Sequence, residues 1–290
     1  MSLQDLSSYT AAMGRRAFVG DGHLWVEKKA GFLDSFPPHR PICLPAKEAR
    51  RFFWRGVAAI RHTCDSSEGL PSFEYIWDDK NFGMHSLHRY ARRNVRRNID
   101  SCVVRSVEFE LLAKEACAIN RSAFARQKRP MNSLFTDDSR WNEYMKACGR
   151  LPALEAYGAF VEGRLCGYSL AMLVDDYCYL VHTSAATEYL KYCPMNILIY
   201  SIVETMLARQ SVRRVSAGLE SFTPHPTIEQ FKLGMGCRKS IIYRRVVMNP
   251  VARPIFSRPG ASLTTAFLKY VRPGLVADFA SFSQYVQRAY

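Results

Sequence analysis

The sequence predicts an α+β fold in which helices pack on one mixed, mostly antiparallel sheet. The first observation behind this prediction is a three-strand meander over residues 154–185. The second is the segment 193–210, which is largely apolar and has Pro194 in its first turn, as the start of a buried helix would. The third is the order of the later elements, a strand, a short helix and a last strand, at 212–219, 227–234 and 240–248.

The turns of the meander are predicted at Glu162-Gly163 and Asp175-Asp176, between its three strands. Gly149 is suited to end the helix before it, because glycine tolerates the backbone conformation that ends many helices. The other elements predicted before the meander are helices at about 45–61, 85–100, 109–126 and 136–148, and strands at Leu24–Lys29, Ser72–Asp78 and 102–107.

This pattern divides the chain into three parts. Residues 1–104 contain too few elements for a full domain and end in a basic helix, and residues 105–249 contain a complete pattern of helices and strands. Residues 250–290 form a tail in which proline breaks precede an amphipathic segment, 276–287. Two interpretations of that segment stay open, a helix that docks on the core and a segment that lies on a membrane surface.

Length and composition indicate a globular chain. With 290 residues and 48% hydrophobic content, it can bury an ordinary core. No apolar run approaches the roughly 18 residues that cross a bilayer, and the first residues lack the apolar segment of a signal peptide. We therefore expect a cytoplasmic protein, whose tail could make a peripheral contact at the inner face of the membrane.

The charge balance is strongly basic, with a formal net charge of +14. Such a charge favours an anionic partner, and it does not choose among nucleic acid, an anionic membrane, a phosphorylated cofactor and an acidic carrier protein. The nine cysteines lie far apart and form no C-x-x-C pair. We expect most of them to be small buried apolar residues in a reducing compartment, and we predict no metal site.

One predicted helix has an unusually basic face. At about 100° per residue, its arginines fall within an arc of roughly 140°, opposite four apolar residues. No acidic residue lies between Asp79 and Asp100 to neutralise them locally, so anion binding is favoured over a solvated face with internal ion pairs. The arginines are Arg89, Arg92, Arg93, Arg96 and Arg97, and the apolar residues are Leu87, Ala91, Val95 and Ile99.

Two further segments place polar residues at the ends of elements. Lys191 and Asn196 flank the start of the predicted helix at Pro194, where a positive helix dipole favours anions, although an ordinary helix start explains them equally well. Glu220 comes directly after a strand that ends near Gly218, a place where sheets display reactive groups. Glu220 is the favoured general base or amine clamp, and it could equally cap the following loop or pair with Arg213 or Arg214.

Two residues remain as candidates. His182 lies near the end of a central strand, and simple alternation puts it on one face with Cys178, Leu180 and Ser184; a satisfied core histidine is the commoner explanation of such a residue. Lys232 lies in the short helix "TIEQFKLG", which Gly234 and Gly236 are expected to end. It could equally be a surface lysine.

Taken together, "LHRYARRNVRRNID", "PMNILIY", "SAGLES" and "FKLGMG" resemble the branch of GNAT acyltransferases that includes the Fem-type aminoacyltransferases of peptidoglycan assembly. The similarity covers about residues 85–248. It implies a GNAT fold in 105–249, preceded by a truncated GNAT-like half. The positions that match the family pattern are Arg92 and Arg96, Pro194 and Asn196, Gly218, and Phe231, Lys232 and Gly236.

The resemblance implies an N-acyltransferase that moves an acyl group from a CoA or carrier thioester to an amine. The donor is then a co-substrate, with no permanently bound cofactor. The GNAT pyrophosphate signature is absent between the meander and Pro194, so acyl-CoA, an acylated carrier protein and an aminoacyl-tRNA all remain as donors. A non-enzymatic polyanion-binding module is the rival interpretation.

The predicted site then has two groups of residues. Glu220 or His182 takes the amine proton, Tyr192 protonates the leaving group, and much of the acceleration comes from positioning. The residues expected to bind donor or substrate are Arg92, Arg96, Lys191, Asn196, Gly218, Ser221 and Lys232.

Overall fold

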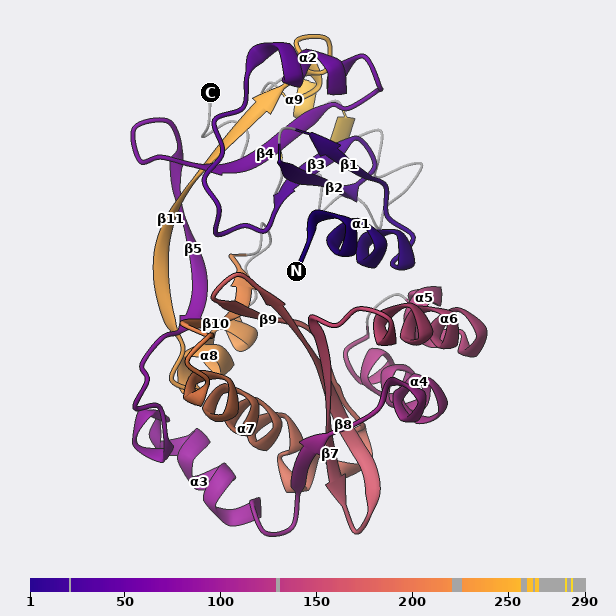
Figure 1. Ribbon diagram of the computed structural model, residues 1–290, viewed down its shortest axis with the longest axis vertical. Helices are drawn as coiled ribbons and strands as arrows, with labels where there is room; N and C mark the ends of the chain where they lie inside the picture. Colours follow the sequence, from indigo (N-terminus) through magenta and orange to yellow (C-terminus); the bar gives the residue numbers. More distant parts are fainter. Residues whose placement is uncertain are drawn as a thin grey trace. The chain divides into compact units, whose positions relative to one another are not determined.

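A computed structural model describes residues 1–20, 22–128, 131–220, 226–256, 260–262, 264–265, 280 and 283 (Figure 1). The chain forms two compact units, each assembled from separated segments. Unit 1 contains 1–14, 74–218 and 227–240, and unit 2 contains 15–73, 219–226 and 241–290. The predicted division into residues 1–104, 105–249 and 250–290 stays a prediction.

The sheet of unit 1 contains the predicted meander. Its strands lie side by side in the order β5, β10, β9, β8, β7, β6, and the meander β7–β8–β9 pairs antiparallel throughout. Both predicted turns are confirmed, with left-handed φ angles at Glu162, Gly163 and Asp175. The strands are β5 (Leu70–Trp77), β6 (Val103–Ser106), β7 (Leu154–Val161), β8 (Arg164–Val174), β9 (Tyr177–Ala185) and β10 (Arg214–Leu219).

Helices cover both faces of this sheet (Figure 1). One face carries α4 (Phe109–Arg126), α5 (Ser133–Thr136) and α6 (Asp138–Gly149), on which α1 (Leu3–Ala12) packs. The other face carries α7 (Pro194–Ala208), with α3 (Arg89–Asn98) beside it. Two short 3-10 turns, η1 (Met84–Ser86) and η2 (Thr187–Tyr192), and the helix α8 (Pro226–Gly234) complete the elements of this unit.

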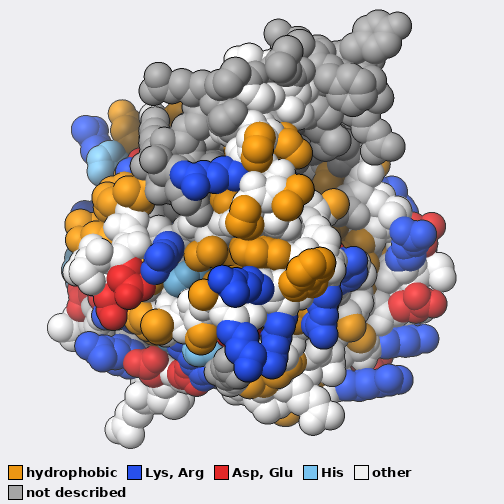
Figure 2. Space-filling view, turned by 90° about the horizontal axis from the view of Figure 1, so that it is seen from above, with side chains coloured by type: hydrophobic (Ala, Val, Ile, Leu, Met, Phe, Trp, Pro, Cys, Tyr) orange, Lys and Arg blue, Asp and Glu red, His pale blue; other side chains and the backbone are white. Residues whose placement is uncertain are grey.

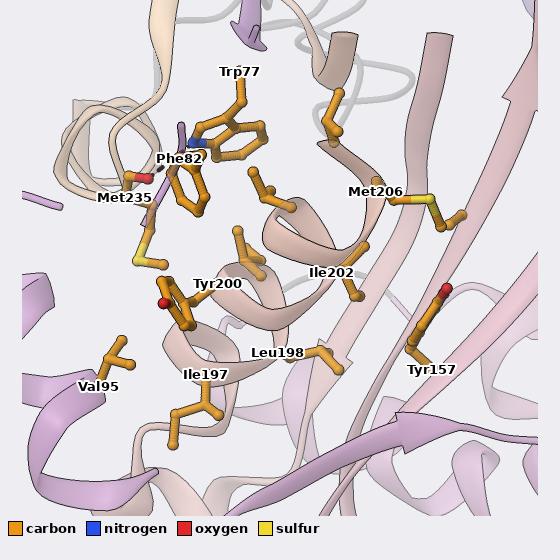
Figure 3. Close-up of a cluster of buried hydrophobic side chains, with 14 of the residues drawn as sticks. Trp77, Phe82, Val95, Tyr157, Ile197, Leu198, Tyr200, Ile202, Met206 and Met235 are labelled. Atoms are coloured by element: carbon orange, nitrogen blue, oxygen red, sulfur yellow. Dashed lines mark hydrogen bonds between the residues drawn. The ribbon is translucent and has the colours of Figure 1, made fainter. Parts of the chain in front are cut away.

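The core of unit 1 is built around α7, as its apolar sequence predicts. Figure 3 shows Leu198 and Ile202 on this helix, with Val95 of α3 and Tyr157 of β7 on different sides of it. The predicted apolar side of the basic helix is confirmed for Leu87, Ala91 and Val95, which are buried. Ile99, at the end of the helix, is exposed.

Unit 2 contains the strands β1 (Ala17–Gly20), β2 (His23–Lys29), β3 (Phe32–Phe36), β4 (Ala59–Cys64) and most of β11 (Arg238–Met248), in that order. The predicted helix 45–61 is wrong in its second half. The helix α2 (Ala46–Phe53) ends before Gly56, whose φ of 81° turns the chain, and the next residues form β4. The short strands β1 and β3 and the helix α1 were not predicted.

A charged cluster lies inside unit 2. Arg61 donates two hydrogen bonds to Asp34, from Nε to Oδ1 and from Nη2 to Oδ2, both at 2.7 Å. Arg244 Nη2 lies 3.5 Å from Asp34 Oδ1, and its side chain is 1% exposed. Burial alone would raise the pKa of Asp34, but the charges of Arg61 and Arg244 outweigh it and hold that pKa well below its usual range.

The remaining predictions about the chain as a whole have mixed outcomes. Seven of the nine cysteines are buried, as expected, while Cys43 is exposed and Cys193 half-buried. The amphipathic segment 276–287 lies almost wholly outside the described residues, in which α9 (Arg253–Phe256) is the last helix with defined bounds. Across the described part of the chain, every helix is too short or too polar to span a bilayer.

Candidate acyl-transfer site

The parallel strands β9 and β10 pair over three residues only. The pairs are Arg214 with Tyr177, Val215 with Cys178 and Ser216 with Tyr179, at the first residues of both strands. Both strands continue beyond this point, β9 to Ala185 and β10 to Leu219. Beyond these pairs the two strands exchange no ladder hydrogen bonds with each other, and other groups serve part of the backbone of β10: Gly218 N–H donates to Ser216 Oγ at 3.1 Å.

A β-bulge in β9 begins directly after the last of these pairs. Leu180 pairs with Ala171 and His182 with Leu170, so Val181 is an extra residue opposite β8. An extra residue reverses the alternation of side chains along a strand. The prediction that His182 shares a face with Cys178 and Leu180 is therefore wrong: those two pack in the core around α7, and His182 faces α5.

His182 lies among aromatic rings on the face covered by α4, α5 and α6. Its imidazole stacks on Phe135 with 4.5 Å between centroids, and its Nε2 lies 3.5 Å from Oδ1 of Asn120. This burial lowers the pKa of His182 to about 4, although part of the residue reaches the surface. At neutral pH His182 is an uncharged imidazole, which can accept a proton but is a weak base.

Lys232 lies where β10 leaves its partner. Its Nζ donates a 2.8 Å hydrogen bond to the carbonyl oxygen of Ala217, the residue after the last pair, and lies 4.4 Å from the ring centre of Tyr75. Burial lowers the pKa of Lys232. Within the described residues, no carboxylate lies at ion-pair distance from Lys232 Nζ, although the charge of Glu229, which is paired with Lys239, opposes the lowering of its pKa from farther away.

The glycines after Lys232 have separate roles. Helix α8 ends at Gly234, and Gly236 has a φ of 80°, with the carbonyl oxygen of Ser86 2.6 Å from the place of a Cβ atom. Any other residue at 236 would collide with that backbone. Phe231, one of the positions that match the family pattern, packs against the core around α7, so the turn that carries Lys232 is fixed at both ends.

Gly218 lies one residue before the end of β10 at Leu219, close to the predicted strand end. Its φ of 91° favours glycine, and no atom lies within 4 Å of the position that a Cβ would take. Glu220 is exposed and belongs to unit 2, where its backbone N–H donates to Phe73 and its Oε2 accepts from the hydroxyl of Ser72 at 3.3 Å. Ser221 lies outside the described residues.

The start of α7 offers few backbone donors. Pro194 has no N–H, and the amides of Asn196 and Ile197 both donate to the carbonyl of Cys193. The side chain of Asn196 donates to Met235 Sδ at 3.3 Å instead of capping the helix. A phosphate at this helix start would therefore depend mainly on cationic side chains.

Those cations come from η2 and α3. Lys191 is exposed, with its Nζ 4.9 Å from the ring centre of the half-buried Tyr192. Burial raises the pKa of Cys193, and the positive charge of Arg97 opposes this shift. The end of α3, which carries Arg97, is therefore close to the start of α7. Arg96 is exposed on the same turn.

Arg92 differs from the other arginines of α3. Its Nη2 donates to the carbonyl oxygens of His85 and Leu87, at 2.9 and 2.8 Å. These bonds tie the start of the helix to the preceding turn, so Arg92 has a structural role here. The exposed face that remains for an anion consists of Arg89, Arg93, Arg96 and Arg97.

The structure thus places the predicted residues in separate groups. Asn196 of α7 donates to Met235 Sδ, next to α8, and Lys232 of α8 donates to the carbonyl of Ala217, the residue before Gly218. Figure 3 shows the carbonyl oxygen of Met235 accepting from Trp77 Nε1. His182 lies on the face opposite α7, and Glu220 belongs to the other unit. Among the described residues, no three His, Cys, Asp or Glu side chains are grouped as metal ligands would be.

Sequence analysis missed two residues next to these groups. Tyr75 supports Lys232 through its ring and donates from its hydroxyl to Glu229 at 3.1 Å. Asn120 is fully buried and accepts a 2.6 Å hydrogen bond from Tyr168. Asn120 was detectable, because it is a polar residue on the apolar stripe of α4 with Ala116 and Ala123.

A family model of the acetyltransferase (GNAT) domain matches residues 88–232, which is half of the chain. The chain therefore belongs to the GNAT acetyltransferase family, and acyl transfer is the reaction class of its domain. Among curated proteins, none matches the sequence.

Solved structures resemble the fold at low sequence identity. FemX has a TM-score of 0.60 at 12% identity, over 88% of this chain and 93% of that one. The L-PGS structure from Bacillus licheniformis has a TM-score of 0.56 at 11% identity, over 88% and 94%. The C-terminal domain of a putative lysylphosphatidylglycerol synthetase from Agrobacterium fabrum has 0.55 at 9%, over 92% of both. These likenesses bear out the predicted Fem-like GNAT fold.

Proposed function

We propose that the chain is an N-acyltransferase that joins an activated acyl or aminoacyl group to an amine. One observation carries the proposal: β9 and β10 part after three pairs, and a half-buried cation without a carboxylate partner among the described residues lies beside the gap. In a GNAT domain, such a gap gives an extended donor a place between two strands.

The reaction needs little from side chains. The amine nitrogen attacks the donor carbonyl, the new C–N bond forms, and the C–S or C–O bond to the carrier breaks. Backbone N–H groups near the bulge in β9 stabilise the tetrahedral oxyanion. The amine loses its proton to His182, directly or through water, and Tyr192 returns a proton to the leaving group. Because His182 is a weak base, most of the acceleration comes from positioning.

The donor's anionic part is held by side chains in this proposal. Lys232, Lys191 and Arg96 supply positive charge, while the start of α7 has already used several of its amides. This arrangement supports a donor with an extended anionic part, an acylated carrier protein or an aminoacyl-tRNA, alongside acyl-CoA. The donor is a co-substrate, and we assign no permanently bound cofactor.

A thermal-shift panel identifies the donor. We expect one of acetyl-CoA, long-chain acyl-CoA, acylated carrier protein and aminoacyl-tRNA to raise the melting temperature, because it binds only the folded chain. The donor that does so is then tested for transfer of a labelled acyl group to a panel of amines.

The rival function is a GNAT-fold module that binds polyanions without catalysis. Its support is the exposed arginine face of α3. If RNA binds with a steep salt dependence and no donor yields a labelled product, the enzymatic proposal is wrong and the rival is right. Labelled product with any of the four donors excludes the rival.

A further inference from the structure

A surface of unit 2 combines large exposed apolar side chains with a run of arginines. Trp54, the residue after α2, is 89% exposed, and Val251 is 86% exposed. The turn that carries Val251 lies next to the residues that connect α2 to β4, because Asn249 donates from its backbone N–H to the carbonyl oxygen of Ala58 and from Nδ2 to that of Val57. Figure 1 draws α2 and α9 at the same end of unit 2. We call this surface, with Ile255 of α9, the α2–α9 face.

The charge of the α2–α9 face has one sign. Residues 40–56 contain five cations and a single acid, Glu48. Glu48 is buried and accepts a hydrogen bond from Trp25 Nε1 at 3.3 Å, so it is turned away from the surface. The exposed cations are Lys47, Arg50, Arg51 and Arg55. Figure 2, seen from the end where α2 and α9 lie, shows hydrophobic side chains together with Lys and Arg.

We propose that the α2–α9 face docks on an anionic lipid surface. An indole beside several guanidiniums is the combination that binds the headgroup region, where the ring inserts and the cations meet lipid phosphates. The aliphatic side chains of Val251 and Ile255 argue for lipid over nucleic acid, because they can enter the acyl region and have no charge or ring to offer a polynucleotide.

This inference is independent of the acyl-transfer proposal. It also differs from the predicted membrane contact of the tail, because it rests on residues of α2 and of the turn before α9. A docked α2–α9 face would confine the chain to two dimensions and so favour an acceptor amine or donor that is itself at the membrane surface.

The fluorescence of Trp54 provides a direct test. The other three tryptophans, Trp25, Trp77 and Trp141, are at most 2% exposed. We would mix the full chain with vesicles of phosphatidylcholine, with and without phosphatidylglycerol, whose acyl chains are brominated. The expected result is quenching with the anionic vesicles only, and its loss in Trp54→Phe.

Charge reversal on the α2–α9 face tests the same proposal by vesicle sedimentation. Each arginine near an anionic surface contributes roughly a fivefold factor to partitioning, so Arg50→Glu/Arg51→Glu should weaken binding by at least about 25-fold. The control Lys146→Glu/Arg164→Glu makes the same change of charge at exposed residues of unit 1 and should stay within about twofold.

Three results would overturn the proposal. One is absence of binding to anionic vesicles. Another is an equal loss of binding in the control pair, which would indicate an unspecific effect of net charge. The third is binding of RNA, and not of vesicles, that Arg50→Glu/Arg51→Glu abolishes. A melting curve for each variant shows that it is folded, and Trp54→Ala gives a second variant without a charge change.

Discussion

In unit 2, the carboxylate of Asp34 lies between Arg61 and Arg244, whereas in unit 1 Lys232 lies against a carbonyl oxygen and an aromatic ring. Both sites bury cationic side chains near a sheet. The first neutralises its guanidiniums internally, which serves stability, and the second leaves a positive charge beside the point where two strands part. Of these two buried cationic sites, we therefore expect only the one at Lys232, which has no ion-pair partner among the described residues, to bind an anion.

The largest expected effect concerns the neutralised cluster. Asp34→Ala leaves Arg61 and Arg244 buried without their carboxylate and should lower the free energy of unfolding by about 3–5 kcal/mol. Guanidinium unfolding measures this change. The control Asp138→Ala removes an exposed ion pair with Arg121 and should cost less than about 1 kcal/mol. Equal losses of unfolding free energy in the two variants would show that Asp34 does not stabilise buried arginines in this unit.

The same cluster makes the stability of the chain depend on pH in the acid range. The folded-state pKa of Asp34 is lowered, so its contribution to stability is complete above the unfolded value of about 3.9 and is lost as the pH falls below it.

The next largest effect is a loss of stability that depends on His182 and occurs at higher pH than that of Asp34. Its folded-state pKa of about 4 lies below the usual 6.5, so the unfolded chain binds more protons between these values. Stability should therefore fall by about 2–3 kcal/mol as the pH is lowered from 7 to 4. Unfolding curves of His182→Gln should lack this component, and those of His88→Gln, at an exposed histidine, should retain it. A flat profile for the unaltered chain would mean that His182 is not desolvated.

A smaller effect distinguishes two arginines of one helix. Arg92→Ala removes hydrogen bonds to His85 and Leu87 and should destabilise the chain by about 1.5–3 kcal/mol. Arg96→Ala should change stability by at most about 0.5 kcal/mol, because Arg96 is exposed. Arg96→Ala should instead weaken binding of a polyanion and reduce its salt dependence. Thermal melts measure the stability of each variant, and RNA titrations measure its binding. If Arg96→Ala destabilised the chain and Arg92→Ala weakened RNA binding, the roles assigned to the two arginines would be exchanged.

The sequence predicted unit 1 well because its elements are long and regular. The helix 109–126 has its predicted bounds, and both turns of the meander have the expected residues. The helix predicted over 45–61 failed because the same run contains the end of a helix, Gly56, and a short buried strand. Strands of four or five residues, such as β1 and β3, carry too few alternations to be recognised.

The candidate site was predictable only in part. The motif around Lys232 and the strand end at Gly218 were visible in the sequence, and they lie near each other in unit 1. The bulge at Val181 was not, because it depends on pairing with β8, and it moved His182 to the other face. Tyr75 could not be found either, since 140 or more residues separate it from Ala217 and Lys232 in the chain.

The most direct test compares two lysines near one ring. Lys232 and Lys239 have Nζ atoms 4.4 and 5.9 Å from the ring centre of Tyr75, but Lys239 is paired with Glu229 at 2.5 Å. With the donor found by thermal shift, kcat/KM for acyl transfer should fall about 10- to 100-fold in Lys232→Ala, which is about 1.4–2.7 kcal/mol, and stay within about twofold in Lys239→Ala. Full activity in folded Lys232→Ala would contradict the assignment of an anion site beside the parted strands.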